Sequence, residues 1–319
     1  MSTPHLALAP DEHRLDNLRD TMRHLAPFIE DPVVLEIMLN ADGVVWVDRA
    51  GDGLVETGLR MGAADAETML KLIASIAQLE LGPDNPTLSA RVPGWGLRVQ
   101  ASLPPIVDAP VFALRKPARL VFTLDDYVRK QILSAEQATK LRAAVLARAN
   151  ILFGGPTSSG KTTLANAAMA VMSETGDRIY IVEDTPELQC SARNHVRVLL
   201  QSGYTAQRAI ADALRFRPDR IVVGEVRDGS ALQLIKAWNT GHPGGLATIH
   251  ADDTPRMLDR VCQLIEEVLP AAPRQFVAEA INVLVHIRRD PDHPAGRVVS
   301  AIDRVDGLGA DGSWRLSPL

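Results

Sequence analysis

Aromatic residues are scarce in this sequence, since phenylalanine, tryptophan and tyrosine make up only 4% of its 319 residues. Proteins that bind single-stranded nucleic acid without sequence preference stack the bases on aromatic side chains, so the composition argues against that class. An excess of basic residues is missing too, because 34 lysines and arginines face 39 aspartates and glutamates and leave a net charge of −5. A strongly basic stripe for duplex DNA is therefore not evident.

Cysteine is almost absent, and the two that occur, Cys190 and Cys262, are far apart with no CxxC spacing. This argues against a disulfide framework, excludes a four-cysteine zinc module and fits a reducing cytoplasm. No apolar run approaches the ~20 residues that a membrane-spanning helix needs, and no charged-then-apolar leader opens the chain. The sequence therefore predicts a soluble protein, or one bound at most to a membrane surface.

The length exceeds one average domain and predicts two. Helical spacing of apolar residues at 11–28 and 64–80, and a hairpin pattern over 33–47, dominate the first part of the chain. Further short strands follow up to residue 114. Residues 1–121 are therefore expected to form a small α+β domain with helices against an antiparallel sheet.

Residues 122–135 show the weakest pattern, and we interpret them as a linker. Ser134 and Gln137 then have the spacing of a helix-capping box. Through residues 136–319, unbroken apolar strands alternate with helices, which predicts an α/β domain with a mostly parallel sheet covered on both faces. The predicted strands are 151–154, 179–183, 221–225 and 246–250, and the predicted helices are 136–148, 161–172, 206–215, 230–239 and 255–268.

The segment after the strand 151–154 matches the phosphate-binding pattern GxxxxGK[ST] and opens a predicted helix. Backbone N–H groups of such a P-loop and the helix N-terminus hold a phosphate chain, and glycine lets the main chain approach it. Lys161 is expected to bridge the β- and γ-phosphates, and the Thr162 hydroxyl to bind Mg²⁺. The predicted nucleotide-binding residues are Gly155, Pro156, Thr157, Ser158, Ser159, Gly160, Lys161, Thr162 and Thr163.

Acidic residues end the next two predicted strands, with Glu183 and Asp184 after the second and Glu225 after the third. Residues at the carboxyl ends of parallel strands face the ligand crevice, where a carboxylate can activate water or bind Mg²⁺. Asp184 can instead simply cap the following turn. Gly224 stands where most P-loop enzymes have the Mg²⁺-binding aspartate, so the division of labour between Glu183 and Glu225 stays open.

His250 ends the fourth predicted strand, at the same edge of the sheet as the two glutamates. From there it can contact the γ-phosphate through a hydrogen bond. A single histidine at a strand end is more often structural. Because His242 precedes the same strand and a P-loop lies beside it, we favour a functional role for His250.

These motifs follow one another as in the type II/type IV secretion ATPase superfamily, which the chain resembles over roughly residues 30 to 290. The segments that resemble the Walker A motif, the Asp box, the Walker B motif and the His box are 155–163, 183–187, 217–227 and 240–251. Within that superfamily, the segments 112–117 and 236–245 resemble the TrbB-type conjugal-transfer ATPases. The glycine before Glu225 is typical of the superfamily.

The resemblance implies a ring hexamer in which a PAS-like N-terminal domain precedes a RecA-like P-loop domain, with nucleotide between them. It implies that Glu183 is the catalytic carboxylate and that Glu225 lies at the Mg²⁺ ion. It assigns Arg98 and Arg115 to the γ-phosphate, because guanidinium groups neutralise charge on a transferred phosphoryl group. Arg227 is expected either to reach a phosphate or to pair with an acid.

The function that the resemblance implies is an ATPase motor, using ATP and Mg²⁺, that powers a conjugative type IV secretion system. It would work with other secretion-system subunits on the cytoplasmic side of the inner membrane. A type IV pilus or type II secretion motor is the nearest alternative. A RecA-like DNA-handling ATPase, a GTPase and a nucleotide-binding scaffold without turnover are the others. The absence of a guanine-reading NKxD sequence argues against a GTPase.

Overall fold

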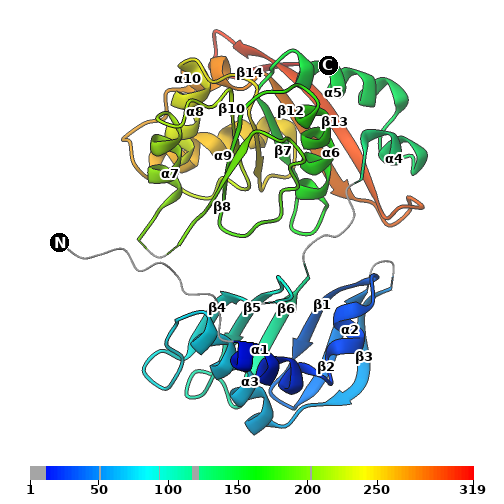
Figure 1. Cartoon of the computed structure of the whole chain (residues 1–319). Helices are drawn as coiled ribbons and strands as arrows, with labels where there is room; N and C mark the ends of the chain where they lie inside the picture. Colours follow the sequence, from blue (N-terminus) through cyan, green and yellow to red (C-terminus); the bar gives the residue numbers. More distant parts are fainter. Residues whose placement is uncertain (1–11, 50–51, 93, 117–121, 202) are drawn as a thin grey trace, which may run out of the picture. The chain divides into compact units, whose positions relative to one another are not determined.

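The computed structural model describes residues 12–49, 52–92, 94–116, 122–201 and 203–319. The chain divides into two compact units, Met1–Arg119 and Leu120–Leu319 (Figure 1). Each unit has its own β-sheet. One cluster of buried apolar side chains fills the N-terminal unit, and two clusters fill the C-terminal unit.

The N-terminal unit is an antiparallel sheet with helices packed on one of its faces. Its helices are α1 (Glu12–Met22), α2 (Ala26–Glu30) and α3 (Ala63–Ile76), and its strands are β1 (Val34–Leu39), β2 (Val44–Arg49), β3 (Gly53–Arg60), β4 (Thr87–Arg91), β5 (Arg98–Ser102) and β6 (Val111–Arg115). The strand order is β3-β2-β1-β6-β5-β4. This is the expected combination of helices against an antiparallel sheet.

Two features of this unit differ from the expectation. The single helix predicted over 11–28 is interrupted, because α1 ends at Met22 and α2 begins at Ala26. Pro27 lies in the first turn of α2, where its missing N–H costs nothing. Strand β3 was not predicted, since it is largely exposed and lacks the alternation of apolar and polar residues that marks a half-buried strand.

The C-terminal unit is built on a mixed sheet, in which most strands pair in parallel, as predicted, and an antiparallel part that was not predicted lies at one edge. Its strands are β7 (Ile151–Gly154), β8 (Ile179–Glu183), β9 (His195–Leu199), β10 (Arg220–Val223), β11 (Leu246–Ile249), β12 (Val283–Arg289), β13 (Arg297–Leu308) and β14 (Trp314–Pro318). Their order is β14-β13-β12-β7-β11-β10-β8-β9. In this order, every neighbouring pair from β12 through β7, β11, β10 and β8 to β9 is parallel. The pairs β12–β13 and β13–β14 are antiparallel.

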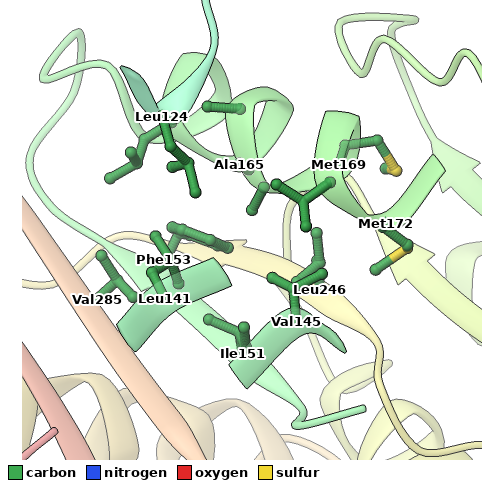
Figure 2. Packing of buried hydrophobic residues seen from close by; sticks show 14 of the residues in the cluster. Leu124, Leu141, Val145, Ile151, Phe153, Ala165, Met169, Met172, Leu246 and Val285 are labelled. Atoms are coloured by element: carbon green, nitrogen blue, oxygen red, sulfur yellow. The ribbon is translucent and has the colours of Figure 1, made fainter. Parts of the chain in front are cut away.

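Helices cover both faces of this sheet, as its unbroken apolar strands predict. They are α4 (Leu124–Arg129), α5 (Ala135–Leu146), α6 (Lys161–Ser173), α7 (Ala206–Ala213), α8 (Ala231–Asn239), α9 (Thr254–Glu266) and α10 (Arg274–Ala280). Alternate residues of β7 enter different cores. Phe153 packs with α4, α5 and α6 (Figure 2), while Leu152 packs with the helices from α7 to α10.

The segment 122–135, expected to be a linker, contains helix α4 and belongs to the second unit. A capping box between Thr123 and Asp126 begins the helix, and Leu124 and Tyr127 are buried in the core beside α5 and α6. This α4 capping box and its apolar pair explain why the segment is ordered. The predicted capping box between Ser134 and Gln137 is confirmed and begins α5.

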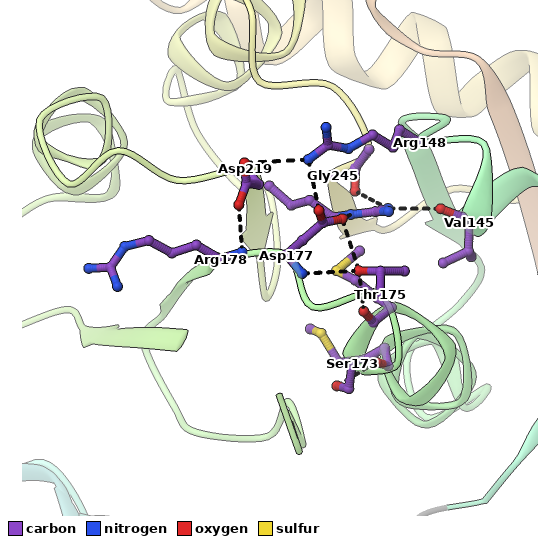
Figure 3. A network of polar contacts seen from close by, with 12 residues as sticks. Val145, Arg148, Ser173, Thr175, Asp177, Arg178, Asp219 and Gly245 are labelled. Carbon is purple, nitrogen blue, oxygen red and sulfur yellow. Dashed lines mark hydrogen bonds and ion pairs between the residues drawn. The ribbon is translucent and has the colours of Figure 1, made fainter. Parts of the chain in front are cut away.

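At the amino ends of the central strands, a buried guanidinium ties several elements together (Figure 3). Arg220, 1% exposed, donates from Nε to Asp177 Oδ2 at 2.6 Å and from one terminal nitrogen to the carbonyl oxygens of Val145 and Gly244. Arg148 reaches the other oxygen of Asp177 at 3.1 Å. Because a buried charge is costly unless it is paired, these bonds hold β10, α5 and the loops beside them in one arrangement.

Candidate active site

The P-loop joins β7 to α6 and is shaped by its glycines. A Cβ on Gly155 would lie 2.1 Å from the carbonyl oxygen of Ile287 on β12, and Gly160 has a φ of +102°. Larger residues therefore cannot take this path. The Ser159 hydroxyl is buried in the same loop and has no hydrogen-bond partner in the described part of the chain. The loop has the form of an anion cradle at a helix N-terminus.

Lys161, the first residue of α6, is 7% exposed, and its ammonium group uses all three of its protons. It donates to the carbonyl oxygens of Gly155 at 2.9 Å and Pro156 at 2.8 Å, and to Nδ1 of His250 at 3.2 Å. Burial lowers the pKa of Lys161, and the nearby carboxylate of Glu225 opposes that shift. To bind a phosphate, the ammonium group must exchange one of these acceptors for a phosphate oxygen.

His250 connects Lys161 with Glu225. Because an ammonium group can only donate, Nδ1 of His250 accepts, and the ring proton lies on Nε2. Nε2 then donates to Glu225 Oε1 at 2.6 Å. Burial and the positive charge of Lys161 lower the pKa of His250, which favours this neutral tautomer. The predicted proximity of these residues at one edge of the sheet is therefore found.

Arg227 pairs with two acids. Its Nε lies 2.7 Å from Glu225 Oε2, and a terminal nitrogen lies 2.8 Å from Asp184 Oδ2. Lys161, His250, Glu225, Arg227 and Asp184 thus form a continuous chain of polar contacts at the carboxyl ends of the strands. Of the two roles expected for Arg227, the structure contains the acid pairing.

Glu225 lies two residues beyond the end of β10, and its position depends on Thr248 of β11, which the sequence analysis did not single out. The Thr248 hydroxyl donates to the carbonyl oxygen of Gly224 at 2.7 Å. The N–H of Val226 donates to the carbonyl oxygen of Thr248 at 2.9 Å. Two bonds therefore fix the backbone on either side of Glu225.

Glu183 has a different environment from Glu225, with only 2% of the residue exposed. Its Oε1 accepts from the N–H groups of Glu187 and Leu188. Oε2 lies 3.4 Å from Arg197 Nε and has no hydrogen-bond partner among the described residues. Burial raises the pKa of Glu183 to about 7, although the two N–H groups and Arg197 oppose the shift.

The glycine before Glu225 now has a physical explanation. A Cβ on Gly224 would lie 3.2 Å from Cγ of Glu183 and 3.6 Å from the carbonyl oxygen of Val182. The first distance is shorter than an ordinary contact between carbon atoms. A side chain at position 224 would therefore require the side chain of Glu183 to shift by a few tenths of an ångström.

Comparison with known proteins adds to this geometry. A family model described as "Type II/IV secretion system protein" matches residues 24–290. The chain is 42% identical over 290 residues to a probable conjugal transfer protein TrbB of Sinorhizobium fredii, covering 90% of this chain and 88% of that protein. It is 41% identical over 294 residues to the conjugal transfer protein TrbB of Rhizobium radiobacter, covering 92% and 89%. The chain belongs to the type II/IV secretion ATPase family.

The fold of this secretion ATPase agrees with that of a solved relative. The crystal structure of the pilus retraction motor PilT with bound ADP superposes with a TM-score of 0.66 at 20% identity, covering 91% of this chain and 84% of that one. The C-terminal unit therefore has the α/β fold of these ATPases, and family membership makes nucleotide binding and ATP hydrolysis its activity. Among its described helices, none is long and apolar enough to cross a membrane.

The two arginines expected at the γ-phosphate lie in the N-terminal unit of the secretion ATPase. Arg98 on β5 and Arg115 on β6 are paired directly opposite each other, and Arg91 on β4 is paired with Arg98. Their side chains point away from the core formed by their neighbours Val99 and Leu114. In the described part of the chain the side chains of these three arginines have no hydrogen bond or ion pair.

Two further arginines contact the P-loop of the secretion ATPase and were missed by sequence reasoning. A terminal nitrogen of Arg297 donates to the Ser159 carbonyl oxygen at 3.4 Å, and Nε of Arg289 donates to the Ser158 carbonyl oxygen at 3.4 Å. Both come from β12 and β13, more than a hundred residues later in the chain. No motif marks them, so only the pairing of β12 with β7 brings them to the loop.

Proposed function

We propose that this secretion ATPase is the hexameric motor of a conjugative type IV secretion system and works with other secretion subunits at the cytoplasmic side of the inner membrane. Its relatives among conjugal transfer proteins support this assignment. The observation that carries the chemistry is the contact chain from Lys161 through His250 to Glu225. A P-loop lysine beside a carboxylate is suited to nucleoside triphosphate hydrolysis.

ATP and Mg²⁺ fit the residues of this site. The buried, unpartnered hydroxyl of Ser159 and the N–H groups of the P-loop offer donors to phosphate oxygens. Among the described residues, no three His, Cys, Asp or Glu side chains gather to hold a metal ion. Thr162 and Glu225 would therefore hold Mg²⁺ together with phosphate oxygens, as is usual for this ion. When bound, Mg²⁺ neutralises charge on the β- and γ-phosphates.

Glu183 is the proposed proton acceptor. As water attacks the γ-phosphorus, the bond to the β–γ bridging oxygen breaks, and the water proton passes to Oε2 of Glu183. Within the described ranges this oxygen has no hydrogen-bond partner, although Arg197 Nε lies 3.4 Å from it, and the pKa of about 7 lets the group exchange protons near neutral pH. Glu225, held by His250 and Arg227, is assigned to the metal.

Two glutamine variants test this division of labour. Glu183→Gln is expected to stop phosphate release while the protein still binds a non-hydrolysable ATP analogue, because glutamine cannot accept the proton. Glu225→Gln is expected to raise the Mg²⁺ concentration needed for the half-maximal rate. An unchanged rate in Glu183→Gln, or an unchanged Mg²⁺ dependence in Glu225→Gln, contradicts the assignment.

Arg98 and Arg115 are proposed to contact the γ-phosphate from a PAS-like N-terminal domain, while the C-terminal unit is RecA-like. Like charges directly opposite each other on neighbouring strands repel, so an anion bound between them is stabilising. Arg115→Ala is expected to slow hydrolysis and leave analogue binding largely intact. Loss of affinity with normal turnover of bound ATP excludes that role. Arg91→Ala, one strand further along, is the matched control.

The oligomeric state tests the motor itself. We expect mass measurements in solution to show a hexamer in the presence of a non-hydrolysable ATP analogue, and a parallel assay to show ATP hydrolysis. A motor that moves partner proteins needs several subunits acting in turn. A strict monomer that is fully active alone would contradict the proposed function.

A further inference from the structure

A second histidine near the site, His286 on β12, has no role in the mechanism above. It is 4% exposed, and both of its ring nitrogens have partners. Nδ1 lies 2.6 Å from the hydroxyl oxygen of Ser300 on β13. Nε2 lies 3.2 Å from the carbonyl oxygen of Ala251, the residue that follows His250.

The direction of these hydrogen bonds follows from chemistry. A carbonyl oxygen can only accept, so Nε2 of His286 carries the proton and donates it to Ala251. Nδ1 is then an acceptor for the Ser300 hydroxyl proton, and the carbonyl oxygen of His286, 3.3 Å from the same hydroxyl oxygen, is a second acceptor for it. Burial lowers the pKa of His286, which agrees with a neutral ring in this tautomer. The ring thus links the Ser300 side chain on β13 to the backbone that follows β11.

The hydrogen bond from His286 to Ala251 passes the carboxyl end of β7, where the P-loop begins. Strands β12 and β11 both pair with β7, and in their registers His286 and Ile249 are the two partners of Gly154. His286 therefore reaches past the end of β7 to the loop that follows β11. The first residue of α9, directly after this loop, is also bonded to β13, since the Thr254 hydroxyl donates to Asp303 Oδ2 at 2.5 Å.

We propose that His286 is a positioning residue for the nucleotide site. By donating to the Ala251 carbonyl it fixes the backbone that carries His250, so that the imidazole of His250 faces Lys161 and Glu225. The inference rests on the proposed function, in which those contacts serve ATP hydrolysis. Supporting groups of this kind commonly change activity by about 10- to 100-fold when they are removed.

Two amide substitutions of His286 distinguish the loss of its hydrogen bond to Ala251 from the loss of the packing of its ring. The amide nitrogen of glutamine lies near the position of Nε2, whereas that of asparagine reaches only as far as Nδ1. His286→Gln therefore keeps a donor for Ala251, and His286→Asn loses it. We expect kcat for ATP to fall about tenfold in His286→Asn with little change in KM, and to recover largely in His286→Gln.

The matched control is His242, whose Nδ1 lies 2.9 Å from the Pro218 carbonyl oxygen at the other end of β11. His242→Gln, whose amide nitrogen lies near the Nε2 position and therefore loses this bond, is expected to leave kcat unchanged. Equal kcat values in the parent and His286→Asn, or equal losses in the asparagine and glutamine variants, would overturn the proposal.

The ¹⁵N signals of the His250 ring supply a readout that does not need turnover. They are expected to report a proton on Nε2 in the parent and in His286→Gln, and a mixture of tautomers in His286→Asn. Unaltered His250 signals in a folded His286→Asn overturn the inference. A parent with these signals but without ATP hydrolysis contradicts the proposed function and leaves the inference supported.

Discussion

The two ends of the central sheet use polar side chains in opposite ways. At the amino ends of the strands, Arg220 is 1% exposed and bonds one carboxylate and two carbonyl oxygens. At the carboxyl ends, the side chains of His250 and Arg227 are 47% and 52% exposed and take part in a chain of ion pairs. Both ends contain charged pairs, but the central guanidinium is buried at the amino ends and exposed at the carboxyl ends.

The difference in burial decides what each end can do. A buried pair is costly to break, because the remaining charge cannot be solvated, whereas an exposed pair contributes little and exchanges partners easily. The amino end therefore stabilises the fold, and the carboxyl end can rearrange around a ligand. Glu183 and Lys161 are exceptions, since both are buried at the carboxyl ends of the strands, which we call the reactive end.

The largest effect is expected at the reactive end. Lys161→Ala should lower the rate of phosphate release by about a hundredfold or more, because the charge that neutralises the β- and γ-phosphates is lost. The midpoint temperature of thermal unfolding should change little. Retained turnover in this variant would contradict the assignment of the P-loop.

The next effect is expected at the amino end and concerns stability. Arg220→Met should lower the free energy of unfolding by about 3 kcal/mol, because Asp177 and two carbonyl oxygens lose their donor. The rate per folded molecule should stay the same. Arg215→Met, at a side chain 86% exposed, is the control and should change stability by less than about 0.5 kcal/mol. Similar urea unfolding curves for the two variants would show that the buried pair at the amino ends does not stabilise the fold.

The pH dependence of the hydrolysis rate tests the role of the buried Glu183. If Glu183 accepts the proton, the hydrolysis rate of the parent protein should fall about tenfold per pH unit below its pKa of about 7. Stability should change in the opposite direction. Because folding raises this pKa from about 4.5, the contribution of Glu183 to stability is complete below pH 4.5 and is lost as the pH rises through 7. A parent rate that is flat between pH 5.5 and 7 would, on the same reasoning, exclude Glu183 as the acceptor.

The smallest effect is expected for Thr248, a buried residue whose side chain holds the backbone beside Glu225. Thr248→Val keeps the shape of the side chain but removes the donor to the Gly224 carbonyl oxygen, which should cost about 1 kcal/mol of stability. The rate should fall only a few-fold, since the Val226 bond still holds Glu225. A loss as large as that of Lys161→Ala would show that the backbone, and not the charge, limits the reaction.

Much of the fold was predictable because it depends on neighbours in the sequence. The capping box at Ser134 and the strands β7 and β8 depend on local hydrogen bonds and on runs of apolar residues, and they occur where predicted. The prediction failed for β3, which is exposed, and for the antiparallel strands β13 and β14. Burial along these three strands is mixed and largely intermediate or exposed, so they lack the unbroken apolar runs that predicted β7 and β8.

By itself, the sequence determined that a P-loop opens a helix after a buried strand, and that Glu183, Glu225 and His250 come at the ends of parallel strands. Only the tertiary structure decided their individual environments. Burial beneath neighbouring segments raises the pKa of Glu183, and contacts with His250 and Arg227 hold Glu225. Desolvation and hydrogen bonding depend on groups brought together from distant parts of the chain, so motif spacing alone cannot reveal them.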